Sequence, residues 1–138
     1  MNPTDYFSIK FENQKLIFLD QTKLPLEEVY VETDNLERIA EVIEQLEIRG
    51  APLIGIAAAY ALALSLKNVI AEHEKVFNLS YKRLFQTRPT AVNLFRALND
   101  LNEEFEKLSD KKFTFETLLT KAKEIHQKDE EYCIKIGR

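Results

Sequence analysis

Two short segments of the sequence place an arginine directly before a predicted helix. One is Arg49-Gly50-Ala51-Pro52 and the other is Thr87-Arg88-Pro89-Thr90. A helix N-terminus carries about half a positive charge, so a cation beside it costs up to about 1 kcal/mol, and acidic residues are the usual choice there. Both segments place an arginine where an acidic residue is preferred, and such exceptions to local preferences are typical of functional sites.

An anion bound at the two helix starts would resolve this electrostatic conflict. The free N–H groups of a first helical turn can bind a phosphate, and an arginine adds a planar, bidentate donor. Gly50 would let the backbone approach such a ligand closely, because glycine has no Cβ. Alternatively, either arginine could pair with a nearby carboxylate, such as Glu47 or Asp100, and serve only the structure. The pattern by itself leaves both interpretations open.

The remaining polar residues predict no catalytic or metal site. His73 and His126 lie far apart in the sequence, and no Cys or His spacing matches a metal site. We expect His73 to be solvated and His126 to lie on the polar side of the last helix. Cys133 is the only cysteine, which excludes an internal disulfide and favours a reducing, cytoplasmic setting.

Composition narrows the class of protein further. The net charge is −4 and the basic residues are scattered, so we expect no nucleic-acid partner. The start of the chain lacks the pattern of a signal peptide. The most apolar stretch, Leu53–Leu66, is shorter than the roughly 20 residues of a membrane span, so we expect no membrane insertion. Gly55 within it is expected to permit close helix packing.

The elements that position the two arginines are predicted to be a small sheet followed by a helical bundle. Alternating apolar residues and short connections predict an antiparallel meander, with strands at residues 7–11, 15–19 and 29–31. From residue 34 on, the apolar spacing becomes helical. The fold class is therefore mainly α (α+β), with a three-stranded antiparallel sheet over residues 1–33 and a bundle over residues 34–138 of a single domain.

The helices are predicted from their apolar stripes and capping residues. Asp34 with Glu37 fits a capping box, and Thr114 is expected to cap the last helix. The predicted segments are a helix at 36–48, a buried helix at 51–73, one short helical turn at 80–85, a helix at 89–108 and a last helix at 114–136. No polar tail follows the last helix, so we expect the natural protein to continue beyond it.

Three motifs resemble those of the methylthioribose-1-phosphate isomerases, a family that also includes the alpha, beta and delta subunits of translation initiation factor two-B. Residues 49–60 are similar to the first N-terminal signature of this family, and residues 87–94 are similar to the second. Residues 19–25, with the sequence LDQTKLP, resemble the strand-end motif upstream of both. The motifs occur in the family's order and the resemblance covers essentially the whole chain.

The resemblance implies a function for the full-length protein. It would isomerise 5-methylthioribose 1-phosphate to 5-methylthioribulose 1-phosphate in methionine salvage, as a cytoplasmic homodimer without a metal or organic cofactor. Arg49, Gly50, Ala51 and Arg88 match positions that bind the phosphorylated sugar in the family. The catalytic cysteine and aspartate of the family belong to a C-terminal Rossmann-like domain. We therefore expect that domain to be absent here, no catalytic residue in this chain and no activity of the chain alone.

Other functions remain open. A ribose-1,5-bisphosphate isomerase belongs to the same family and would share these N-terminal motifs. A regulatory subunit like those of the initiation factor would use the fold for assembly and nucleotide sensing, and retention of both arginine motifs argues against it. A purely structural helical domain would leave both arginines unexplained.

Overall fold

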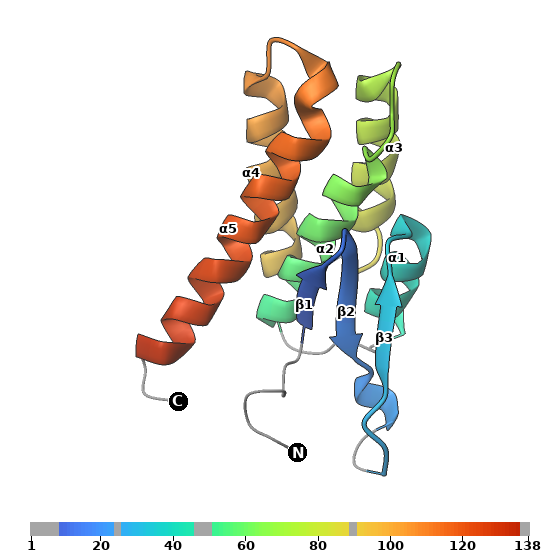
Figure 1. Ribbon diagram of the computed structural model, residues 1–138, viewed down its shortest axis with the longest axis vertical. Coiled ribbons are helices and arrows are strands. Elements are labelled where there is room, and N and C mark those ends of the chain that lie inside the picture. Colours follow the sequence, from blue (N-terminus) through green and yellow to red (C-terminus); the bar gives the residue numbers. More distant parts are fainter. Residues whose placement is uncertain (1–8, 24–25, 46–50, 89–90, 136–138) are drawn as a thin grey trace.

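In the computed structural model, a small antiparallel sheet lies against a bundle of helices (Figure 1). The structure describes residues 9–23, 26–45, 51–88 and 91–135. The predicted fold class, mainly α with a three-stranded antiparallel sheet, is confirmed. Among the described residues, no helix has the length and apolarity that crossing a membrane would require.

The sheet consists of three strands in the order β1-β2-β3, which are Ile9–Glu12, Lys15–Leu19 and Tyr30–Thr33. Asn13 and Gln14 join the first two strands with positive φ angles of 55° and 59°. Two residues with positive φ form a tight turn whose twist suits a hairpin. Leu16 and Phe18 are fully buried, so one face of β2 forms part of the core.

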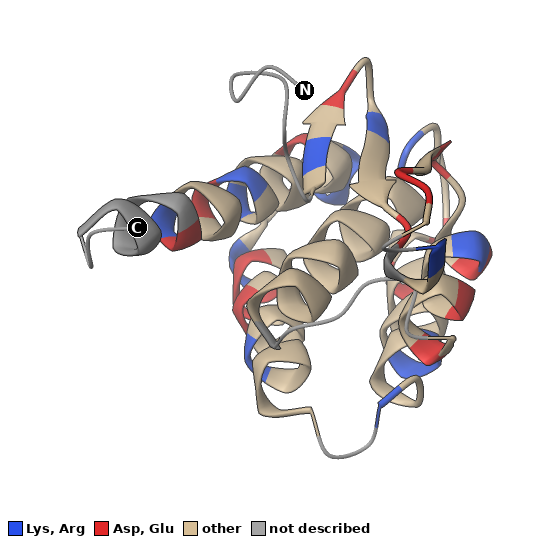
Figure 2. Cartoon of the chain, turned by 90° about the horizontal axis from the view of Figure 1, so that it is seen from below, with Lys and Arg blue, Asp and Glu red and all other residues tan. Residues whose placement is uncertain are grey.

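Helix α2 (Ala51–Ser65) is the centre of the bundle. It contacts the four other α-helices, which are α1 (Leu36–Glu44), α3 (His73–Phe85), α4 (Val92–Lys107) and α5 (Thr114–Lys135). Figure 2 shows it as a helix without charged residues, surrounded by helices that carry their charges on outer faces. Residues 54–64 are buried without interruption, which confirms the prediction of a central buried helix.

The predicted extent of α2 is wrong, because α2 ends at Ser65 and not near His73. Asn68 adopts a left-handed conformation with a φ of 66°, a conformation that asparagine tolerates and that ends a helix. His73 instead begins α3, which spans 13 residues where a single helical turn was predicted. The buried face of α3 includes Ser80 beside Phe77 and Leu84. Because Ser80 is polar, the apolar spacing of this helix is interrupted in the sequence.

Two predicted helix caps are also wrong. The cap of α1 is Asn35, whose side chain accepts a hydrogen bond of 2.9 Å from the Arg38 N–H. Helix α1 begins at Leu36, as expected, and Asp34 lies before the Asn35 cap, where its carboxylate is 3.6 Å from the Lys67 ammonium. Thr114 is buried as the first residue of α5, and its hydroxyl donates to the carbonyl of Lys111.

Candidate functional site

The starts of α2 and α4 lie side by side at one end of the bundle, the lower end in Figure 1. Gly55 in the first turns of α2 packs directly against Asn93 in the first turn of α4. A Cβ added to Gly55 would lie 2.9 Å from the carbonyl oxygen of Asn93, closer than real contacts allow. The glycine therefore permits this close approach, as expected, and the fold brings together two helix starts that are distant in sequence.

Arg88 lies between α3 and α4, and α4 begins at Val92 after the N-cap Ala91, so the predicted helix start at residue 89 is wrong. The Thr87 side chain is buried, and its hydroxyl donates a hydrogen bond of 2.6 Å to the carbonyl of Leu84. The carbonyl of Arg88 itself accepts a 3.0 Å hydrogen bond from the Ala91 N–H. The Arg88 side chain is half-buried and has no ion-pair partner among the described residues. The alternative in which Arg88 pairs with Asp100 is thus not seen in this part of the chain.

The other predicted site residues lie at the start of α2. Ala51 is the first residue of that helix. Arg49 and Gly50 lie outside the described residues, so their positions relative to Arg88 stay a prediction. The structure does show that the starts of α2 and α4 lie next to each other.

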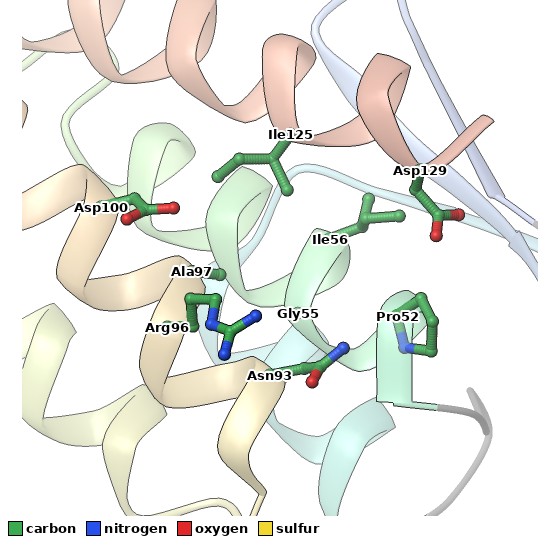
Figure 3. Close-up of a pocket in the computed structure, with 9 residues that line it drawn as sticks. All are labelled: Pro52, Gly55, Ile56, Asn93, Arg96, Ala97, Asp100, Ile125 and Asp129. Atoms are coloured by element: carbon green, nitrogen blue, oxygen red, sulfur yellow. The ribbon is translucent and has the colours of Figure 1, made fainter. Parts of the chain in front are cut away.

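A pocket of about 120 Å³ lies between α2, α4 and α5, next to both helix starts (Figure 3). It is lined by residues from three helices, namely Pro52, Gly55, Ile56, Asn93, Arg96, Ala97, Asp100, Ile125 and Asp129. In Figure 3, Arg96 and Asn93 of α4 point toward the first turns of α2, and the Asp129 carboxylate of α5 lies on the side of Pro52. The pocket therefore combines polar groups with an apolar wall.

Sequence reasoning missed two of the three charged residues of this pocket. Arg96 was not singled out, Asp129 was expected only to belong to a solvated acidic face of the last helix, and Asp100 was considered only as a partner for an arginine. Spacing in the sequence could have identified the pocket residues of α4. Asn93, Arg96 and Asp100 are three and four residues apart, so they share one face of the helix. Asp129 of α5 reaches the pocket only because α5 packs against α2 and α4, and the sequence contains no pattern that predicts this packing.

The two histidines have structural surroundings that were predicted incorrectly. The Tyr60 hydroxyl lies 2.9 Å from Nδ1 of His126, and the two rings meet edge to face with centroids 5.6 Å apart. His126 therefore packs α5 against buried Tyr60 of α2 and does not lie on a purely polar face. His73 is partly buried, with Nε2 3.0 Å from the carbonyl of Val69. Within the described ranges, no group of three or more His, Cys, Asp or Glu residues could hold a metal ion.

The sequence model of the initiation factor 2 subunit family matches residues 47–138, a stretch that includes both helix starts. The chain belongs to this family. The resemblance predicted from the motifs is thereby confirmed.

Curated members of the family give a more specific similarity. A methylthioribose-1-phosphate isomerase from Geotalea daltonii is 39% identical over 137 residues, covering 95% of this chain and 40% of that protein. The isomerase of the same name from Caldicellulosiruptor saccharolyticus is 41% identical over 134 residues, covering 93% of this chain and 39% of that protein. The chain thus spans about 40% of the length of these relatives.

Two solved structures of the family share the fold. The 5-methylthioribose 1-phosphate isomerase of Pyrococcus horikoshii aligns with a TM-score of 0.81 at 31% identity, covering 88% of this chain and 36% of that one. The delta subunit of translation initiation factor eIF-2B from A. fulgidus aligns with a TM-score of 0.78 at 32% identity, covering 90% and 37%. An isomerase and an initiation factor subunit therefore share this arrangement of elements.

Proposed function

We propose that this chain is the N-terminal, substrate-phosphate-binding part of a methylthioribose-1-phosphate isomerase. The observation that carries the proposal is the contact between the starts of α2 and α4, with Arg88 four residues before the first residue of α4 and without a carboxylate partner among the described residues. Two adjacent helix N-termini favour a bound anion, and on this proposal the Arg88 guanidinium binds the same anion. The identity to curated isomerases supports a sugar phosphate as its source.

Each predicted residue has a role in this proposal. Arg49 and Arg88 bind the substrate phosphate through charge-assisted hydrogen bonds, and the backbone at Gly50 and Ala51 donates its N–H groups. Each well-formed contact of this kind contributes about 1.5–3 kcal/mol. The residues of this chain bind and orient the phosphate, while the acid and base for isomerisation come from a C-terminal domain of the full-length protein.

The rest of the proposal concerns the whole protein. Full-length protein would convert the aldose phosphate to the ketose phosphate in methionine salvage, without a metal or organic cofactor. We place it in the cytoplasm as a homodimer. A ribose-1,5-bisphosphate isomerase is the closest alternative, and turnover of the two substrates by the full-length enzyme would separate them.

A regulatory subunit is the second candidate, because the A. fulgidus delta subunit has nearly the same TM-score as the isomerase. Arg88 favours the enzyme, because an arginine kept without a carboxylate partner suits a phosphate site. Full-length protein that binds nucleotides but not methylthioribose 1-phosphate would favour the regulatory function.

The direct test replaces Arg88 in the full-length enzyme. We expect Arg88→Ala to raise KM for methylthioribose 1-phosphate by roughly 10- to 100-fold, since one charge-assisted contact is lost. Arg88→Lys should restore binding only in part, because lysine lacks the planar fork. Steady-state kinetics and the inhibition constant of inorganic phosphate measure both effects.

Lys82→Ala is the matched control, because Lys82 is an exposed cation on the preceding helix α3. It should leave KM and phosphate inhibition unchanged. An Arg88→Ala enzyme with the kinetics of the wild type would contradict the assignment of the phosphate site.

A further inference from the structure

We propose that the pocket between α2, α4 and α5 binds the hydroxyl groups of the sugar, while the phosphate binds at the helix starts. This inference rests on the proposed function and adds Asn93, Arg96, Asp100 and Asp129 as residues that recognise the substrate. It assigns two chemically different parts of one ligand to two adjacent places in the fold.

The first observation is that the charged groups of the pocket are not used by the protein itself. Arg96, Asp100 and Asp129 all line the pocket, yet none of them forms an ion pair with a described residue within 4.0 Å. By contrast, Arg83 on the neighbouring helix α3 binds two glutamates at 2.7 and 2.9 Å. The pocket therefore offers both donors and acceptors to a ligand.

The second observation is the sign of the charge. Two carboxylates and one guanidinium give these three side chains a net charge of −1, which disfavours a second anion in the pocket. The place for the phosphate is instead beside Arg88 and the helix N-termini. A neutral group with several hydroxyls suits the pocket better, because a hydroxyl donates one hydrogen bond and accepts others.

The third observation is how well the lining matches a sugar. Carboxylates of Asp100 and Asp129 can accept hydrogen bonds from hydroxyls, and the Arg96 guanidinium and Asn93 amide can donate to them. Ile56 and Ile125 provide an apolar wall for the C–H groups of the ring. A few directed polar groups on an apolar wall are typical of small-molecule sites.

The position of the pocket links it to the phosphate site. Pro52 and Asn93 line the pocket and belong to the first turns of α2 and α4. Gly55 lines the pocket and packs directly against Asn93, so the pocket lies where the two helices cross. A sugar phosphate with its phosphate at the helix starts would therefore place its sugar at the mouth of this pocket.

The test uses the full-length enzyme with Asp100→Asn and Asp129→Asn, two substitutions that keep the shape of the side chain and remove its charge. We expect each to raise KM for methylthioribose 1-phosphate about tenfold and to leave the inhibition constant of inorganic phosphate unchanged. Arg88→Ala should change both quantities. This difference separates sugar recognition from phosphate recognition.

Glu103→Gln on α4 and Glu124→Gln on α5 are the matched controls, because both are exposed, lie on the same helices and do not line the pocket. Thermal unfolding of every variant verifies that it is folded. Folded pocket variants with an unchanged KM would overturn the inference, as would an equal rise in KM and in the phosphate inhibition constant. A wild-type enzyme that does not isomerise methylthioribose 1-phosphate would instead contradict the proposed function.

Discussion

Gly55 is the single residue on which the contact between the two helix starts depends most directly. A glycine inside a helix normally weakens it by about 1 kcal/mol relative to alanine. Here the position cannot hold even a methyl group, because an added Cβ would lie 2.9 Å from the Asn93 carbonyl oxygen. The cost in helix propensity is offset by close packing of α2 on α4.

We therefore expect Gly55→Ala to lower the free energy of unfolding by about 1–3 kcal/mol, the usual cost of overpacking. The clash is with backbone, so α4 itself must move. Equilibrium denaturation with urea measures the change. Asn78→Ala at an exposed position of α3 is the control and should be nearly neutral. A stabilised Gly55→Ala protein would show that the two helices are not this close.

Arg83 joins two helices that the sequence does not relate to each other. Its guanidinium on α3 binds the Glu37 and Glu44 carboxylates of α1, with contacts of 2.7 and 2.9 Å. Hydrogen bonds from Arg83 hold the pKa of Glu37 below its ordinary value of 4.5. The same two carboxylates raise the pKa of Arg83 further above its already basic value. The cluster therefore fixes α1 against α3.

This cluster predicts a dependence of stability on pH. Because the pKa of Glu37 is lower in the folded protein than in the unfolded chain, its contribution is complete above pH 4.5 and is lost as the pH falls through the lowered pKa. Glu37→Gln should therefore lower Tm at neutral pH, and the difference from the wild type should shrink at acidic pH.

Thermal unfolding followed by circular dichroism between pH 3 and 7 measures this effect. Glu41→Gln is the control, because Glu41 is an exposed carboxylate of the same helix that forms no ion pair with a described residue. A Tm difference for Glu37→Gln that stays constant over the whole range would contradict the role of the Glu37 charge.

On the scale of the whole molecule, the chain spans about 40% of the length of the isomerases that it resembles. Isomerisation moves a proton between adjacent sugar carbons and needs an acid and a base in fixed positions. The resemblance assigns those groups to the C-terminal domain of the family. The residues that this chain contributes, on our proposal, bind substrate.

We therefore expect the chain of 138 residues alone to give no turnover of methylthioribose 1-phosphate. Phosphorus NMR of the substrate follows the reaction directly, and circular dichroism verifies that the chain is folded. The full-length enzyme under the same conditions is the positive control. Isomerisation by the folded chain alone would show that its own residues supply the acid and base.

The sequence by itself determined the order and type of most elements. Period-two alternation predicted the meander, and the apolar run at residues 53–66 predicted the central helix, because both depend on local patterns of burial. The two arginine motifs drew attention to the starts of α2 and α4, and they carried the resemblance to the family. The end of α2 and the start of α3 could not be read in the same way, since a left-handed Asn68 and a buried Ser80 contradict simple patterns.

Only the tertiary structure determined which residues from different elements are neighbours. Gly55 against Asn93, Tyr60 beside His126 and Arg83 between two glutamates all join residues far apart in the chain. The pocket likewise needs α5 to cross α2 and α4 before Asp129 and Arg96 can line the same space. Side-chain periodicity shows which face of a helix is buried but not which helix covers it, because that depends on the packing of all the helices together.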